Sequence, residues 1–367
     1  MIPFVDLEAQ HAAIAGEVEE AALRVIRSGS YILGEPVESF ERNFAHYCET
    51  TEAVAVNSGT SALHLALLAL GIGPGDEVIT TPLTFVATAA AIEYCGARPI
   101  FVDVDPESCT IDPARIESAV TARTKAILPV HLYGHPADLN AILGVAAKRN
   151  LAVVEDAAQA HGARCDGRRV GGIGRLGCFS FYPAKNLGAA GEGGAVVTSD
   201  RTLARTIRML RDWGQERKGE HRLKSFNYRM EALQGAILGV KLRHLDRWNE
   251  RRRQLAGLYD RLLDPRIPRL SRQLDGRQHV FHIYAIRVKD RERVRADLTN
   301  RGIHTGVHYE RPVHLQPAYV NLGYGAGDFP IAEAIATETL SLPMFAELSE
   351  GHVLEVVQQV HDVLGFS

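Results

Sequence analysis

Seven short apolar segments separated by helical stretches constrain the fold of this chain more than any other feature. These segments are AVAVN (53–57), EVITTP (77–82), RPIFVDV (98–104), KAILPVHL (125–132), LAVVEDA (151–157), CFSFY (178–182) and GAVVTS (194–199). Helical patterns such as SALHLALLAL, FVATAAAIEYCG and DLNAILGVAAKRN lie between several of them. Strands that are apolar throughout are typical of a mostly parallel sheet covered on both faces by helices. The sequence therefore predicts a large α/β domain.

The pattern of the sequence changes after a long helical stretch that runs from about Met230 to Leu263. The strand-like run HVFHIYAIRVK, a helical stretch around RERVRADLTNRG and the loop HTGVHYERPVHLQPAY follow it. This mixture indicates a smaller α+β domain, and a chain of 367 residues is long enough for both. We expect the large domain to span 1–245 and the small domain 246–367.

Composition places the chain among globular proteins without a charge that would favour nucleic acid or an anionic membrane. Hydrophobic residues make up 46%, charged residues 23%, and the formal net charge is −3. The densest basic run, residues 251–253, lies in a helical pattern, and we expect it on a solvated or interface face. No segment approaches the roughly 20 apolar residues of a membrane span, and the start of the chain lacks a signal-peptide pattern. We expect a cytoplasmic protein.

Three suggestive patterns are expected to be structural rather than functional. The five cysteines are scattered without a C-x-x-C pair, which is typical of reduced, buried thiols; they are Cys48, Cys95, Cys109, Cys165 and Cys178. The G-x-G-x-x-G match at residues 172–177 precedes a strand-like run instead of following one, which argues against dinucleotide binding. Glycine or proline interrupts the pairs His131/His135 and His304/His308, so we expect no metal site.

A lysine, Lys185, lies inside FSFYPAKNLGAAGEGGAVV (179–197), which otherwise resembles buried strand and glycine-rich turn. Burial disfavours the charged form of an amine and leaves a nucleophile; a structural salt bridge is the alternative role. Ser58 and Thr60 lie where a helix begins after AVAVN, and an anion can approach the backbone there. Asp156 ends an apolar run, where ligands of open α/β sheets bind. A helix cap is the alternative role of Ser58, Thr60 and Asp156.

Together these groups match the chemical needs of pyridoxal phosphate. This cofactor requires an amine for its aldehyde, an anion beside its pyridine nitrogen, donors for its phosphate and a flat side chain against its ring. Lys185, Asp156, the segment 58–60 and Phe85 supply these four kinds of group. The sequence therefore predicts a pyridoxal-phosphate-dependent enzyme.

A series of motifs, in order and over nearly the whole chain, resembles the DegT-type sugar aminotransferases of the aspartate-aminotransferase fold group. The motifs are GSYILGEPVESFERNFAHYC, AVAVNSGTSALHLALLALGIGPGDEVIT, TFVATAAAI, PVHLYGHPADL, VVEDAAQAHGA, FSFYPAKNLGAAGEGGAVVT, NYRMEALQGAIL, HYERPVHLQPAY and LSLPM. The resemblance implies fold type I, in which a mostly parallel seven-stranded sheet flanked by helices forms the large domain and a smaller C-terminal α+β domain follows.

The resemblance also implies roles for individual residues around the cofactor. Lys185 is similar to the lysine that bonds to the cofactor and later moves a proton, and Asp156 to the partner of the pyridine nitrogen. Phe85 is expected to stack on the ring, and Gln159 to lie near the phenolic oxygen. The implied phosphate contacts are Gly59, Thr60, Ser61, Ser180 and, from a neighbouring subunit, Asn227. This last contact implies a homodimer with shared active sites.

The implied reaction moves an amino group from L-glutamate to a keto sugar, expected to be a 3-keto-6-deoxyhexose, on a nucleoside diphosphate. Such a product would serve polysaccharide or antibiotic biosynthesis. The expected sugar contacts are Tyr182, Arg229 from the neighbouring subunit, His308, Tyr309 and His314; packing between the domains is the alternative role of the histidine-rich loop. A 4-keto nucleotide sugar or an inosose remains a possible acceptor, and a regulatory protein that binds the cofactor is the alternative of another class.

Overall fold

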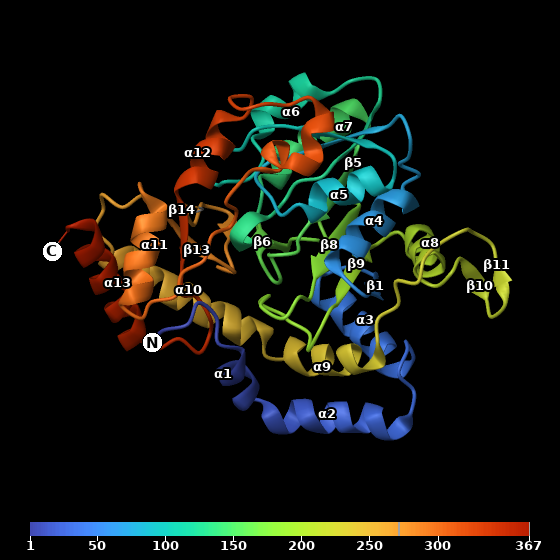
Figure 1. The fold of residues 1–367 in the computed structure, drawn as a ribbon. Helices are drawn as coiled ribbons and strands as arrows, with labels where there is room; N and C mark the ends of the chain where they lie inside the picture. Colours follow the sequence, from blue (N-terminus) through green and yellow to red (C-terminus); the bar gives the residue numbers. More distant parts are fainter. Residues whose placement is uncertain (271, 367) are drawn as a thin grey trace.

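The apolar segments form one sheet at the centre of the molecule (Figure 1). The computed structural model describes residues 1–270 and 272–366. The strand order is β1-β9-β8-β5-β4-β2-β3, with bounds β1 (Glu52–Val56), β2 (Glu77–Thr80), β3 (Arg98–Phe101), β4 (Thr124–Ile127), β5 (Ala152–Asp156), β8 (Leu176–Ser180) and β9 (Gly194–Thr198). Strand β9 runs antiparallel to β1 and β8, whereas the other neighbouring pairs are parallel. The mostly parallel sheet and its seven strands are confirmed.

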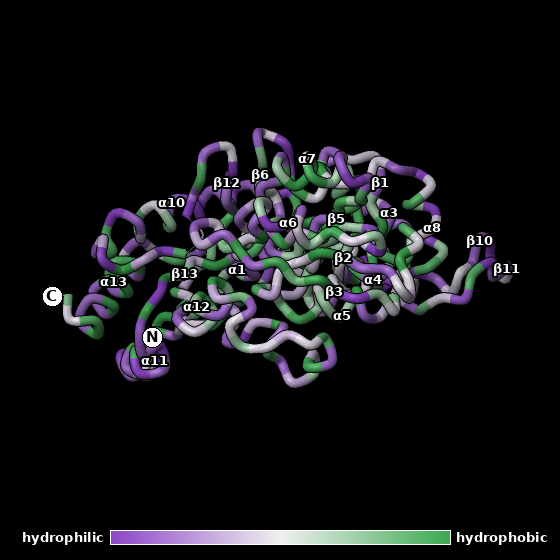
Figure 2. The backbone as a smooth tube through the Cα atoms, turned by 90° about the horizontal axis from the view of Figure 1, so that it is seen from above, coloured by the Kyte–Doolittle hydropathy of each residue, from purple (hydrophilic) through white to green (hydrophobic). Residues whose placement is uncertain are grey.

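Helices cover both faces of the sheet, because successive side chains of a strand point to opposite faces. Ala53 and Ala55 of β1 pack in the core with α3 and α9, while Val54 and Val56 pack in the core with α4 and α8. The helices are α3 (Glu35–Tyr47), α6 (Pro113–Ala119), α7 (Leu139–Arg149) and α9 (Ala232–Leu242) on one face, and α4 (Gly59–Ala69), α5 (Ala87–Tyr94) and α8 (Arg201–Arg211) on the other. Figure 2 shows the hydrophobic strands in the interior between these layers.

The C-terminal part forms a smaller α+β unit around β13 (Tyr284–Arg287) and β14 (Thr339–Leu342), which pair antiparallel. Helices α10 (Leu245–Leu262), α11 (Arg291–Asn300) and α13 (Glu350–Leu364) pack on these strands. Ile2, at the start of the chain, joins the same core and pairs with Ile303. The division of the chain at residues 245 and 246 stays a prediction.

The expected long helix between Met230 and Leu263 is instead two helices, α9 and α10. Arg243 and His244 separate them. Leu238 and Leu242 of α9 belong to the core of the large domain, whereas the later turns of α10 contribute Leu255 and other side chains to the core around β13 and β14. The chain turns between α9 and α10 because the two helices pack into different hydrophobic cores.

Arg252 of α10 is buried, which corrects the expectation that the basic triplet lies on a solvated or interface face. Its side chain is 3% exposed. The guanidinium donates hydrogen bonds to the carbonyl oxygens of Phe281 (3.1 Å), His282 (3.4 Å) and Met344 (2.9 Å). These acceptors offset the loss of water around the charge. Burial nevertheless lowers the pKa of Arg252 to about 10.

The remaining elements are short or peripheral. They are α1 (Leu7–Ala12), α2 (Ala15–Ser28), α12 (Pro330–Glu338), the 3₁₀ helices Leu132–Gly134, Val313–Leu315 and Pro317–Leu322, and the strands β6 (Arg164–Cys165), β7 (Arg168–Arg169), β10 (Gln215–Arg217), β11 (Glu220–His221) and β12 (Arg277–Gln278). All five cysteines are buried, as predicted, and none of them forms a disulfide within the described residues. Within residues 1–270 and 272–366, no helix combines the length and apolar character needed to cross a membrane.

The glycine-rich segment ahead of β8 binds a carboxylate of the chain itself. Glu155 of β5 accepts hydrogen bonds from the backbone N–H groups of Gly171 (2.6 Å), Ile173 (2.8 Å) and Gly174 (2.6 Å). The Nε2 atom of His131 lies 3.0 Å from the same carboxylate. As the sequence indicates, this segment leads into a strand and not into a helix. It holds β5 in place beside β8.

Candidate active site

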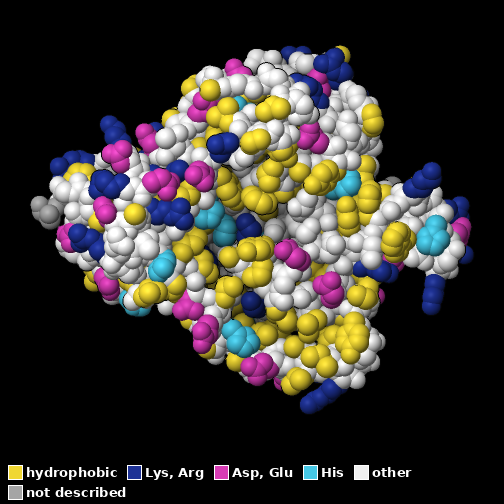
Figure 3. Space-filling view, in the orientation of Figure 1, with side chains coloured by type: hydrophobic (Ala, Val, Ile, Leu, Met, Phe, Trp, Pro, Cys, Tyr) yellow, Lys and Arg dark blue, Asp and Glu magenta, His cyan; other side chains and the backbone are white. Residues whose placement is uncertain are grey.

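A cavity of about 510 Å³ lies at the carboxyl ends of the central strands. Asp156 and Ser180, the last residues of β5 and β8, line it, and the segment after β8 adds Tyr182 and Lys185. Ligands of open α/β sheets bind at this edge of the sheet. Figure 3 shows a hollow near the centre of one face of the molecule, with basic and histidine side chains in it.

Most of the predicted site residues meet in this cavity. The predicted residues in its lining are Gly59, Thr60, Phe85, Asp156, Gln159, Ser180, Tyr182, Lys185, His308 and Tyr309. They come from the start of α4, the segment before α5, the ends of β5 and β8, and the loop before the 3₁₀ helix Val313–Leu315. The fold thus brings together segments that are far apart in the sequence.

Lys185 lies in a turn that buried amide side chains hold in place. The Nδ2 atom of the next residue, Asn186, donates hydrogen bonds to Asn249 Oδ1 (2.8 Å) and to the carbonyl oxygen of Val280 (3.0 Å). Burial lowers the pKa of Lys185 to about 8, although the negative charge of Asp156 opposes this shift. An amine with such a pKa is neutral, and therefore nucleophilic, in roughly a tenth of molecules at pH 7, whereas an ordinary lysine side chain is neutral in far fewer.

Asp156 is 5% exposed and is held by two hydrogen bonds. Thr88 Oγ1 donates to its Oδ2 (2.8 Å), and the N–H group of Ala158 donates to its Oδ1 (3.2 Å). Burial raises the pKa of Asp156, while both hydrogen bonds and the charge of Lys185 favour the ionised form. Sequence reasoning did not include Thr88 in the predicted site. Its hydroxyl also lies 2.8 Å from that of Thr84. The spacing of these two threonines, four residues apart, was the sequence pattern that could have indicated the contact.

The first turn of α4 forms an anion-binding end of the cavity. Ser58 caps the helix, and its Oγ accepts a hydrogen bond from the N–H group of Ser61 (3.0 Å). Gly59 is required there, since a Cβ atom at this position would lie 2.6 Å from the Cβ of Ser180. The first N–H groups of a helix have no acceptor within it, and they favour an anion such as phosphate. Ser61 itself is buried and serves the cap.

The loop that carries His308 and Tyr309 also lines the cavity. Gln159 Nε2 donates a hydrogen bond to the hydroxyl of Tyr309 (2.9 Å), and His308 Nδ1 lies 2.9 Å from Ser341 Oγ. The ring of Phe4 stacks on His308 with centroids 5.5 Å apart. Burial lowers the pKa of His308 to about 4, so this imidazole is neutral at pH 7. Sequence reasoning missed Phe4, which comes from the start of the chain and has no motif around it.

Besides Ser61, three predicted residues do not line the cavity. His314 is 1% exposed, its Nε2 atom lies 3.1 Å from Glu333 Oε1, and its ring contacts Phe329. Within one chain, His314 therefore packs against Glu333 and Phe329 outside the cavity lining. Asn227 and Arg229 lie on the segment before α9, where Arg229 Nε donates to Asn227 Oδ1 (2.9 Å). Within one chain, neither reaches the cavity lining.

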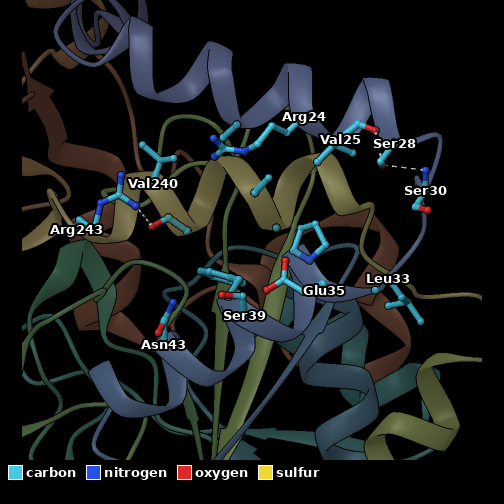
Figure 4. Close-up of a pocket in the computed structure, with 17 residues that line it drawn as sticks. Arg24, Val25, Ser28, Ser30, Leu33, Glu35, Ser39, Asn43, Val240 and Arg243 are labelled. Carbon is cyan, nitrogen blue, oxygen red and sulfur yellow. Dashed lines mark hydrogen bonds between the residues drawn. The ribbon is translucent and has the colours of Figure 1, made fainter.

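A second cavity, of about 570 Å³, lies between α2, α3 and α9. Figure 4 shows its polar lining, which includes Arg24, Ser28, Glu35 and Arg243. The described residues around it include neither a lysine nor a histidine. This cavity offers no nucleophilic amine or imidazole, so we place the chemistry at the sheet edge.

The residues at the sheet edge fit pyridoxal phosphate. Lys185 offers an amine for the aldehyde, buried Asp156 offers a negative charge for the pyridine nitrogen, and the start of α4 offers donors for the phosphate. Phe85, which is 54% exposed, presents an aromatic ring at the cavity. The fold and this set of side chains define the pyridoxal-phosphate-dependent enzymes of fold type I.

The chain belongs to the DegT/DnrJ/EryC1/StrS aminotransferase family, whose model matches residues 12–361. It is 46% identical over 362 residues to the pleiotropic regulatory protein of Geobacillus stearothermophilus, with 98% of this chain and 97% of the relative covered. It is also 46% identical over 365 residues to dTDP-3-amino-3,4,6-trideoxy-α-D-glucose transaminase of Streptomyces venezuelae, covering 98% and 96%. The crystal structure of S. venezuelae DesV in complex with a ketimine intermediate gives a TM-score of 0.96 at 46% identity, with 98% of each chain covered. The predicted family and fold are confirmed.

Proposed function

We propose that this protein is a pyridoxal-phosphate-dependent aminotransferase that moves the amino group of L-glutamate to the ketone of a sugar linked to a nucleoside diphosphate. The meeting of Lys185 and Asp156 in one cavity, beside a helix end suited to phosphate, carries this proposal. The Streptomyces venezuelae relative, a transaminase of a dTDP-linked sugar by its name, supports the choice of acceptor.

Asp156 and α4 bind and orient the cofactor. When bound, pyridoxal phosphate supplies an electron-withdrawing ring that stabilises negative charge on the carbon that loses a proton. The carboxylate of Asp156 keeps the ring nitrogen protonated, and its hydrogen bonds from Thr88 and Ala158 favour the charged form despite burial. The N–H groups and hydroxyls at the start of α4 hold the phosphate.

Lys185 performs two tasks in this scheme. Its amine would hold the cofactor covalently between turnovers. Once released, the amine would act as the general base that takes the proton from the α-carbon of glutamate and as the general acid that gives it back. A pKa of about 8 suits both tasks, because the amine can hold or release a proton near neutral pH. Glutamate leaves as 2-oxoglutarate with consumption of one water molecule, and formation of the sugar amine releases one.

We infer that Tyr182, His308 and Tyr309 contact the acceptor, because they line the same cavity as Lys185. Carbon 3 is the proposed site of amination, which the name of the Streptomyces venezuelae relative supports. The position of the anchored diphosphate decides which carbonyl reaches the reacting nitrogen. A displacement of about 1 Å can reduce the rate about a hundredfold.

With the enzyme first converted to its pyridoxamine phosphate form by L-glutamate, a 3-keto nucleotide sugar should restore the original cofactor absorbance faster than the matched 4-keto sugar or an inosose. His308→Ala should lower kcat/KM for the acceptor at least about tenfold, because a neutral hydrogen-bonding ring is lost from the cavity. The glutamate half-reaction should stay within about twofold of the original, and His304→Ala in the same loop is the matched control.

Preference for the 4-keto sugar would overturn the choice of carbon 3 and leave the aminotransferase proposal intact. The Geobacillus stearothermophilus relative is named as a regulatory protein, so a regulatory role is the second candidate. A cofactor-binding regulator need not carry out the glutamate half-reaction. Failure of every amino donor to convert the bound cofactor would therefore favour that role.

The proposal includes a homodimer in which each subunit completes the site of the other. An apolar patch remains about half exposed on one chain; it consists of Leu23, Ile26, Tyr31 and Ile32. Figure 3 shows hydrophobic side chains gathered over the region of α2. Ile32 pairs with Glu231, which is close in sequence to Asn227 and Arg229, two of the predicted residues that do not line the cavity. A patch of this kind is typical of an interface, and a second copy of the chain would cover it.

Mixed dimers of Lys185→Ala and Asn227→Asp chains should recover activity at one of their two sites, whereas each variant alone should be nearly inactive. In the mixed dimer, one site combines an intact Lys185 with an intact Asn227 from the other chain. The aspartate is chosen because its charge repels a phosphate. Turnover of purified, tagged heterodimers measures the recovery.

Mixed dimers of Lys185→Ala and Lys185→Arg chains are the matched control, since neither of their sites has the amine. If verified heterodimers with Asn227→Asp show no recovery beyond this control, each site is built within one chain. The shared-site proposal would then be abandoned, while the proposed reaction would stand.

A further inference from the structure

We propose that His282 is a positioning residue that holds Lys185 as a neutral amine aimed into the cavity, by donating a hydrogen bond from its Nε2 atom to the amine nitrogen. This inference rests on the proposed function of Lys185. It assigns a role to a histidine that lies 97 residues from the lysine, outside the segments that carry the predicted site.

His282 meets Lys185 inside the same cavity. It precedes β13, its side chain lines the cavity, and it is 8% exposed. Its Nε2 atom lies 3.5 Å from Lys185 Nζ. This is long for a hydrogen bond, but catalytic hydrogen bonds are often long until the reacting groups are bound. The contact is therefore positioned to act on the nucleophilic atom itself.

The surroundings of the imidazole determine which nitrogen carries the proton. The Nδ1 atom of His282 is buried and has no hydrogen-bond partner among the residues that the structure describes. A buried donor without an acceptor is more costly than a buried nitrogen lone pair. The proton therefore belongs on Nε2, which faces Lys185. An ammonium group has three donors and no acceptor, whereas a neutral amine can accept this hydrogen bond.

The groups around His282 keep its ring neutral. Burial lowers the pKa of His282 well below its ordinary value, and the positive charges of Lys185 and Arg252 act in the same direction. Two further histidines, His161 and His308, face it, and burial lowers the pKa of both. A neutral His282 cannot donate from both nitrogens, so the choice of tautomer described above decides its role.

Asp156 acts against a neutral lysine. Its negative charge favours the ammonium form of Lys185, while burial disfavours that form. Neither the charge of Asp156 nor burial orients the lone pair of the Lys185 nitrogen. A donor fixed at Nε2 supplies both a preference for the neutral amine and a defined orientation. This is what a nucleophile beside a carboxylate requires.

The test measures how readily Lys185 reacts in the full-length protein freed of cofactor. Acetic anhydride at limiting concentration labels neutral amines, and peptide mass spectrometry follows Lys185 as a function of pH. Labelling of the original protein should rise with pH through a midpoint of about 8. In His282→Leu, no side-chain donor remains to favour the neutral amine, so the midpoint should move upward. Labelling near pH 7 should then fall about tenfold.

The matched control is His161→Leu, which changes another buried histidine near Lys185 that makes no hydrogen bond to it; its midpoint should stay in place. Lys241, a buried lysine bonded to the carbonyl oxygen of Gly188, reports in each sample whether the protein remains folded. An unchanged midpoint in folded His282→Leu, or an equal shift in His161→Leu, would overturn the role of His282.

Borohydride reduction of the cofactor-loaded original protein separates this inference from the proposed function. An adduct on Lys185 together with an unmoved midpoint refutes the role of His282 alone. Absence of the adduct refutes the proposed function of Lys185, whatever the labelling shows.

Discussion

Lys185→Ala should lose multiple turnovers, with kcat reduced at least about a thousandfold, because it lacks both the covalent anchor and the group that moves the proton. Lys185→Arg should be equally inactive, since a guanidinium stays protonated and is not a nucleophile. Borohydride reduction of the original protein, followed by peptide mapping, should place the cofactor adduct on Lys185. The same treatment should leave no adduct on either variant.

Lys148→Ala is the matched control for the lysine substitutions, because Lys148 is exposed on α7, remote in sequence from the cavity-lining segments. This variant should retain full turnover and the adduct on Lys185. An adduct mapped to another lysine, or substantial turnover by Lys185→Ala, would show that the nucleophile lies elsewhere.

Asp156→Asn should slow the glutamate half-reaction about a hundredfold to a thousandfold while the protein still binds the cofactor. The amide keeps the size of the side chain and can still accept hydrogen bonds from Thr88 or Ala158, but it has no charge to hold a proton on the ring nitrogen. Stopped-flow absorbance measures the rate, and the cofactor content of the purified variant measures binding.

Thr88→Val is the comparison variant for Asp156→Asn. It removes one hydrogen bond from the Asp156 carboxylate without removing the charge, and it should slow the half-reaction only several-fold to about tenfold. If Asp156→Asn were as active as Thr88→Val, the charge of Asp156 would have no special part in the reaction. A loss of cofactor binding in Asp156→Asn would instead assign the residue to binding.

The sheet could be predicted because each strand is apolar throughout and each is bounded by turn or helix signals. AVAVN and LAVVEDA correspond closely to β1 and β5. The break between α9 and α10 could not be predicted in the same way, because Arg243 and His244 are compatible with a helix. Packing against two different cores, which is a tertiary effect, decides where the chain turns there.

The same distinction applies to the site. Lys185 and Asp156 were predictable because a charged group beside a buried strand needs a chemical reason. His282 and Phe4 were not, because a histidine in a strand-like run and a phenylalanine near the start of a chain have no local pattern that points to a cavity. Arg252 was placed at the surface for a related reason: the carbonyl groups that satisfy it belong to distant segments.

Two neighbouring carboxylates on β5 have different roles. Glu155 stabilises the fold, and Asp156 lines the candidate active site. Glu155 occupies the backbone amides that a nucleotide-binding loop would offer to a phosphate, so the glycine-rich segment carries an internal anion and is closed to an external one. Asp156 points to the other face, because side chains alternate along a strand. A slip of one residue in β5 would exchange the two roles. The hydrogen bonds of Glu155 thus fix the register of β5, and this register determines how deeply Asp156 is buried.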